Sequence, residues 1–183
     1  MTSSKALSLE KTQKIFWFSS RLFVPLHPIM MIELHNVTIG ERIRNVSATV
    51  ENGQLLCLTG AVGTGKTTLV RAIMGFIPID GGHISIDGEL LTPQSAPYFR
   101  RQTAYVPQHL SLPDGYTDIS TDYISLLTRA VHSEKPLLII DEPQEPLDEY
   151  ETAKVDSLLE EAVNNGKTVV AVNDHLSENR ISL

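Results

Sequence analysis

The sequence has one cysteine, little positive charge and no apolar run long enough to cross a membrane. A lone Cys57 cannot form an internal disulfide, which suggests a reducing compartment, and its place in an apolar run predicts a buried, inert thiol. The formal net charge of −7 argues against nucleic acid as the main partner. A spanning helix needs about 20 consecutive apolar residues, which the chain never supplies.

Residues 1–31 also lack a domain-like pattern. Their apolar stretches are broken by proline, serine and arginine, and no small-residue cleavage site of a secretory signal follows. We expect either a disordered or loosely docked extension or an upstream translation artefact, with the working protein beginning at Met30 or Met31. The 183-residue chain is long enough for one α/β domain and too short for two, and we expect that domain at residues 32–183.

The remaining sequence alternates between strand and helix patterns. Strands are predicted at 32–39, 43–50, 55–59, 83–88, 103–107, 137–140 and 168–172, and helices at 68–74 and 153–163. Asn52-Gly53 predicts a hairpin turn between the second and third strands. The continuous aliphatic run Leu137–Ile140 is typical of a central parallel strand covered on both faces. The expected fold is α/β, with a doubly wound core and a small antiparallel layer.

The most informative segment is a glycine-rich loop. It consists of Gly60, Ala61, Val62, Gly63, Thr64, Gly65, Lys66 and Thr67, and it matches the phosphate-binding pattern G-x-x-x-x-G-K-[ST]. A strand-like run precedes it and helical spacing begins at Thr68, so its amides would form an anion site at a helix N-terminus. Lys66 would reach the β- and γ-phosphates, and the Thr67 hydroxyl would hold Mg²⁺. The alternative is a turn that binds nothing, against which the flanking segments argue.

A second candidate lies after the aliphatic run, in Asp141-Glu142-Pro143. A carboxylate at the C-terminal end of a central strand lies where open α/β sheets bind their ligands. Asp141 could complete the Mg²⁺ shell, and Glu142 could orient or deprotonate an attacking water. The alternative is an ordinary acidic loop.

Taken in order, these motifs resemble the ATP-binding cassette (ABC) ATPase family over nearly all of residues 32–182. The matching segments are Gly60–Thr67 (Walker A), Tyr105–Gln108 (Q-loop), Leu137–Pro143 (Walker B and the catalytic glutamate) and Pro146–Asp148 (D-loop). The resemblance implies a P-loop NTPase three-layer sandwich with a mainly parallel sheet, and ATP and Mg²⁺ as ligands. It also implies that Gly60–Thr68 bind ATP, that Thr67, Asp141 and Gln108 surround the metal, and that Glu142, Gln108 and His175 are catalytic.

The sequence departs from the family in several places. Only residues 109–140 lie between the Q-loop and Walker B and they contain no Gly-Gly pair, so the signature motif and most of the helical subdomain are expected to be deleted. The slot of the switch histidine holds Asp174, with His175 one residue later, so an ordinary polar loop residue is an equal alternative there. The aromatic residue that stacks on adenine is missing, and Ile39 is the nearest bulky candidate.

These features leave more than one function open. The first hypothesis is a reduced ABC ATPase that binds MgATP, hydrolyses it weakly, and works at the cytoplasmic face of a membrane with a permease. The second is a non-catalytic, nucleotide-responsive subunit that needs an intact ABC partner to supply the signature motif. A small-molecule kinase is less favoured, because Asp-Glu-Pro followed by Pro-Leu-Asp is an ABC pattern.

Overall fold

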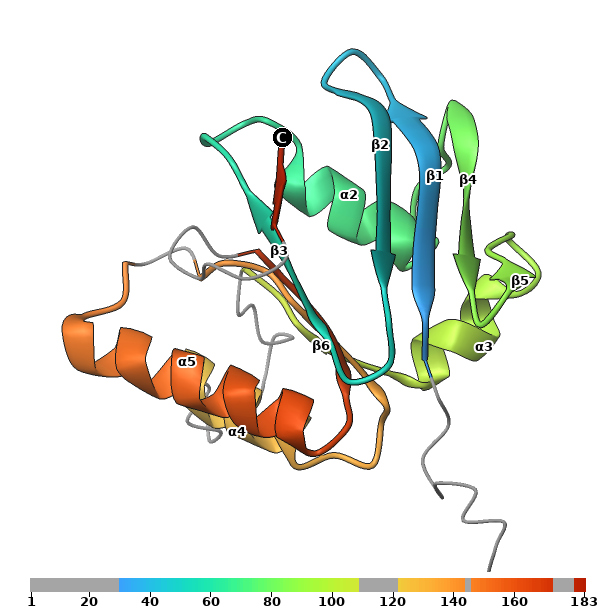
Figure 1. The fold of residues 1–183 in the computed structure, drawn as a ribbon. Coiled ribbons are helices and arrows are strands. Elements are labelled where there is room, and N and C mark those ends of the chain that lie inside the picture. Colours follow the sequence, from blue (N-terminus) through green and yellow to red (C-terminus); the bar gives the residue numbers. More distant parts are fainter. Residues whose placement is uncertain (1–29, 109–121, 144–145, 173–179) are drawn as a thin grey trace, which may run out of the picture.

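The computed structural model describes residues 30–108, 122–143, 146–172 and 180–183 of the chain. Figure 1 shows the order of its elements. The strands are β1 (Ile32–Ile39), β2 (Ile43–Val50), β3 (Leu55–Thr59), β4 (Gly81–Ile86), β5 (Glu89–Leu90), β6 (Thr103–Val106), β7 (Leu137–Ile140), β8 (Thr168–Val172) and β9 (Arg180–Ser182). The helices are α2 (Lys66–Ile73), α3 (Ala96–Arg101), α4 (Tyr123–Val131) and α5 (Glu149–Asn164).

The main sheet has five strands in the order β6-β7-β8-β3-β9, and every neighbouring pair is parallel. Consecutive side chains of β7 alternate between the two faces: Leu137 and Ile139 join one hydrophobic core, and Leu138 and Ile140 join the other. This two-sided burial explains why the strand is aliphatic throughout. The predicted strands 137–140 and 168–172 are confirmed.

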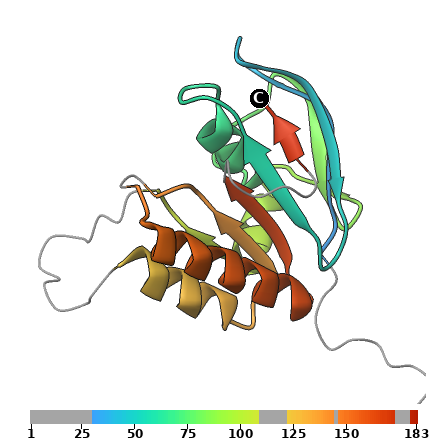
Figure 2. The same cartoon turned by 60° about the vertical axis from the view of Figure 1, so that its left-hand side comes forward.

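Helices cover both faces of this sheet, as Figure 2 shows. The apolar sides of α4 and α5 pack on one face, whereas α2 packs on the other, between the parallel sheet and an antiparallel one. The antiparallel sheet has the order β2-β1-β4-β5. The expected α/β fold with a mainly parallel sheet and a separate antiparallel layer is therefore confirmed. Short elements that carry no strong periodicity, such as α3 and β9, were missed.

The predicted hairpin between the second and third strands is wrong. Gly53 does adopt a left-handed turn conformation (φ 72°). However, β2 pairs with β1, whereas β3 pairs with β8 and β9 in the other sheet. The physical reason lies in β3, where Leu56, Cys57 and Leu58 are all fully buried. Such a strand gains more from a central place in the covered sheet than from the half-exposed antiparallel layer. The burial of Cys57 agrees with the predicted inert thiol.

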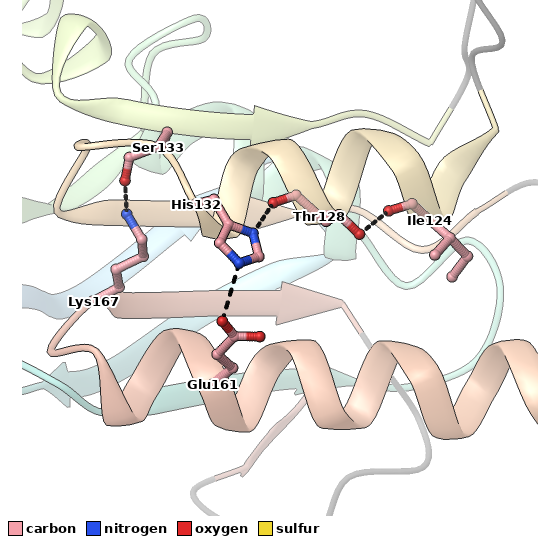
Figure 3. A network of polar contacts seen from close by, with 6 residues as sticks. All are labelled: Ile124, Thr128, His132, Ser133, Glu161 and Lys167. Carbon is pink, nitrogen blue, oxygen red and sulfur yellow. Dashed lines mark hydrogen bonds and ion pairs between the residues drawn. The ribbon is translucent and has the colours of Figure 1, made fainter.

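Polar contacts join α4 and α5 near the N-terminal ends of β7 and β8 (Figure 3). His132 Nδ1 lies 2.8 Å from the Thr128 carbonyl oxygen, and His132 Nε2 lies 3.2 Å from Glu161 Oε1. The buried Lys167 ammonium donates to the Ser133 carbonyl, and its burial lowers the pKa of the amine. These contacts fix the end of the helical layer that is remote from the glycine-rich loop. No helix within the described ranges is long and apolar enough to cross a membrane.

Candidate functional site

The glycine-rich loop joins β3 to α2 and depends on left-handed backbone. Gly60, Gly63 and Gly65 have φ values of 139°, 87° and 112°, which side chains rarely permit. Gly65 is also held by close packing, because a Cβ there would lie 3.0 Å from Ile43 Cγ1. The loop therefore requires glycine both for its curvature and for its contact with the start of β2.

The N-terminus of α2 differs from those of the other long helices. In α4 and α5 an aspartate caps the first turn: Asp122 accepts from the Ser125 amide and Asp148 from the Glu151 amide. The α2 cap is Gly65, which has no side chain to accept a bond, and no acidic residue lies in the first turn. Because helix N-termini carry partial positive charge, this end of α2 is suited to an external anion.

Two side chains at the start of α2 bring the loop and β7 together. The buried Lys66 ammonium donates to the Gly60 carbonyl, which keeps its charge inside the curve of the loop. The Thr67 hydroxyl donates to Asp141 Oδ1 over 3.1 Å. Asp141 is only 1% exposed and directly follows β7. The parallel topology explains this contact, because the C-terminal ends of β3 and β7 lie at the same edge of the sheet.

A cleft of about 210 Å³ contains most of the candidate residues. Its lining residues are Arg42, Val62, Gly63, Gly65, Lys66, Thr67, Thr68, Gln108, Asp141, Glu142 and Val172. Gln108 and Glu142 therefore line the same cleft as residues of the glycine-rich loop, and their roles stay predictions. Ile39 does not line this cleft and packs against the hydrophobic core instead. His175 lies outside the described residues.

The donors in this cleft suit a magnesium ion that keeps several water ligands better than a metal ion bound by protein ligands alone. Within the ranges that the structure describes, no group of three or more His, Cys, Asp or Glu side chains could hold a metal. Magnesium is usually held by one or two protein oxygens together with phosphate oxygens and water. The Thr67 hydroxyl and the Asp141 carboxylate, 3.1 Å apart, supply two hard oxygen donors of that kind.

Tyr123 is a site residue that the sequence reasoning missed. Its hydroxyl donates to the backbone carbonyl of Asp141 over 2.9 Å, which links the start of α4 to the end of β7. Burial, followed by the nearby charges of Asp141 and Glu142, raises the pKa of Tyr123 far above its usual range. The phenol therefore stays neutral and keeps the proton that it donates to the Asp141 carbonyl. No sequence motif marked it, because only the fold brings α4 beside β7.

Arg42, in the turn between β1 and β2, was also missed. It lines the cleft with Lys66 and Thr67, although the whole of β2 and β3 separates it from the glycine-rich loop in the sequence. A single arginine in a short turn carries no signal in the sequence. Its place in the cleft is visible only once the antiparallel sheet is packed against α2.

Comparison with known proteins shows which family the chain resembles. Residues 43–125 match the family model described as ABC transporter. The chain is 37% identical over 84 residues, 44% of its length, to an uncharacterized ABC transporter ATP-binding protein of Haemophilus influenzae, and covers 32% of that protein. It is 38% identical over 96 residues, 46% of its length, to the Fe(3+) ions import ATP-binding protein FbpC 2 of Pectobacterium atrosepticum, of which it covers 28%. The chain thus spans about a third or less of these relatives.

Solved structures agree with this assignment at the level of the fold. An ATP-binding subunit of an ABC transporter matches with a TM-score of 0.63 and 21% identity, over 84% of this chain and 85% of the other. A putative ABC transporter ATP-binding protein from Pyrococcus furiosus matches with a TM-score of 0.62 and 15% identity, over 84% of this chain and 97% of the other. In its motifs, its fold and these matches, the chain is similar to ABC transporter ATP-binding proteins.

Proposed function

We propose that this chain binds MgATP through Gly60–Thr68 and hydrolyses it slowly, as the nucleotide-binding subunit of an ABC transporter. The observation that carries the proposal is the 3.1 Å contact between Thr67 and Asp141, with Lys66 in the same cleft. This arrangement combines hard oxygen donors, a cation and an uncapped helix N-terminus. Together these are the groups that a magnesium-bound polyphosphate requires.

Each residue has a distinct role in this proposal. Amides of the loop and of the α2 N-terminus hold the phosphate chain, and the Lys66 ammonium neutralises its terminal part. Thr67 and Asp141 hold Mg²⁺, which when bound withdraws charge from the phosphate oxygens. Glu142 follows Asp141 and lines the cleft, so that its carboxylate can orient or deprotonate the water that attacks the γ-phosphate. Gln108, which lines the same cleft, is proposed to contact the metal or that water.

Slow turnover is proposed because the sequence has no Leu-Ser-Gly-Gly-Gln-like segment between Gln108 and Leu137. In the family, a partner subunit's signature motif donates hydrogen bonds to the γ-phosphate. Losing one transition-state donor of this type costs roughly 10²–10³ in rate. Nucleotide binding depends on other groups and should be retained.

A membrane permease as partner, and a place at the cytoplasmic membrane face, are proposed because relatives such as FbpC 2 are import ATP-binding proteins.

The missing signature also favours a second candidate function. The chain would then bind nucleotide and change its interaction with an intact ABC partner, with no hydrolysis of its own. The two candidates share the binding site and differ only in the role of Glu142. The glutamate variant described in the Discussion separates them.

The proposal is tested by titrating MgATP into the purified chain in a calorimeter. Lys66→Ala removes the cation and leaves the loop amides, so we expect affinity to fall at least tenfold, about 1.4 kcal/mol or more. Lys154→Ala, an exposed change on α5, is the matched control and should bind like the parent. Equal affinity of the parent chain and Lys66→Ala would refute this mode of binding.

A further inference from the structure

The turn Gly40-Glu41-Arg42 is fixed against the glycine-rich loop. The strands around it close at the pair Ile39 and Ile43. The Gly40 amide donates to Asp80 Oδ2 over 2.6 Å, which ties the turn to the loop before β4. On the other side, a Cβ built at Gly65 would lie 3.1 Å from Ile43 Cδ1 and 3.8 Å from Arg42 Cβ. The backbone of Arg42 is therefore held beside the start of α2.

The two arginines of this region differ in what they contact. Arg44 Nε donates to the Glu41 carbonyl over 3.1 Å. The Arg44 guanidinium therefore forms a hydrogen bond within the turn itself. Arg42 lines the cleft, and within the described part of the chain no protein group forms a hydrogen bond or ion pair with its side chain. Arg42 is also exposed, so its guanidinium can reorient toward a ligand.

The charges lining the cleft show what such a ligand would be. Asp141 and Glu142 lie at the wall formed by the end of β7, whereas Lys66 and Arg42 lie at the loop and the β1–β2 turn. A metal ion fits the acidic wall, and an anion fits the cationic one. A guanidinium has a planar fork of donors that matches two phosphate oxygens, and its hydration is weak enough to exchange for them.

We propose that Arg42 is a second cation for the phosphate chain of the bound nucleotide, acting with Lys66 in the same cleft. The inference rests on the proposed nucleotide binding and adds a residue that no motif contains. Because Arg42 and Lys66 belong to separate elements, phosphate binding would join the antiparallel layer to the parallel sheet.

The test compares MgATP with magnesium tripolyphosphate, which keeps the phosphates and lacks the nucleoside. We expect Arg42→Ala to weaken binding of both ligands about tenfold, the usual range for a charged hydrogen bond. Arg42→Lys should recover part of the loss for both, and Arg42→Gln should not. Arg44→Ala is the matched control, because it removes the same charge two residues away from a side chain that does not line the cleft. This variant should bind both ligands like the parent. Thermal unfolding of each variant checks that the turn stays folded.

Three results would overturn the inference. Unchanged binding by Arg42→Ala, in a preparation where Lys66→Ala binds poorly, would remove Arg42 from the site and leave the proposed function standing. Loss of MgATP affinity alone, with tripolyphosphate unaffected or not bound by the parent, would assign Arg42 to the nucleoside. A parent chain that binds neither ligand would overturn nucleotide binding itself, and this inference with it.

Discussion

The Thr67 hydroxyl donates to Asp141 Oδ1 over 3.1 Å, although the two residues are 74 positions apart in the sequence. One belongs to the first turn of α2 and the other follows β7. The contact preorganises two oxygen donors before any ligand arrives, so little rearrangement is needed to complete a metal shell. If these two oxygens hold the metal as proposed, changing either residue should alter how strongly nucleotide affinity depends on Mg²⁺.

Asp141→Asn keeps the size of the side chain and removes its charge. We expect MgATP affinity to fall about tenfold or more, because the proposed metal site loses the charge of the Asp141 carboxylate. ATP affinity measured with excess EDTA should change little or improve, since the carboxylate then only repels the phosphates. Calorimetry under the two conditions checks this. A variant equally weakened with and without Mg²⁺ would indicate misfolding at this buried position.

Much of the fold could be predicted because its strongest patterns have a single physical explanation. Leu137–Ile140 is aliphatic at every position, which is typical of a strand that is buried on both faces, and all four residues are buried. The turn of the glycine-rich loop was equally clear, because Gly60, Gly63 and Gly65 occupy positions that require positive φ. That the loop binds phosphate stays a prediction. Asp141 and Glu142 could be predicted as cleft residues from their place after a central strand.

Residues that reach the site only through packing could not be predicted. Tyr123 contacts Asp141 because α4 covers the face of the sheet beside β7, and a helical pattern does not specify which strand it will cover. The prediction of a hairpin at Asn52-Gly53 was wrong for a related reason. A turn sequence determines local backbone and leaves open whether the next strand pairs with its neighbour or enters another sheet.

Glu142→Gln should affect turnover more than binding. The amide keeps the shape and hydrogen bonding of the carboxylate and loses its basicity and charge, so ATP affinity should stay the same or rise while residual hydrolysis falls. Phosphate release by the purified chain measures the rate, and Glu160→Gln on the exposed side of α5 is the control. Identical rates for the parent chain and Glu142→Gln, whether zero or background, would favour the non-catalytic candidate.

Tyr123→Phe removes one hydroxyl and should cost about 0.5–1.5 kcal/mol of unfolding free energy near neutral pH, because the Asp141 carbonyl loses its donor. The cost should shrink at alkaline pH. The folded pKa of Tyr123 is raised, so above the ordinary tyrosine pKa of about 10 the unfolded chain loses this proton while the folded chain keeps it. The stability of the parent therefore falls with rising pH in that range, and this contribution is absent in the phenylalanine variant.

Urea unfolding at pH 8 and pH 11 measures both parts of this expectation. Tyr105, whose pKa is also raised by burial, is present in both proteins and cancels from the difference. A stability difference that stays constant or grows between the two pH values would show that Tyr123 does not titrate as its surroundings require.

The pairing of β3 has a consequence for the order of events on the ribosome. This strand carries the glycine-rich loop at its end, yet its hydrogen-bonded neighbours on both sides, β8 and β9, begin at Thr168 and Arg180. A growing chain therefore exposes the loop long before the strands that hold it have been synthesised. If the loop binds phosphate as proposed, affinity requires that β8 and β9 have been synthesised, so nascent chains that stop before β8 would not compete for the cell's nucleotide.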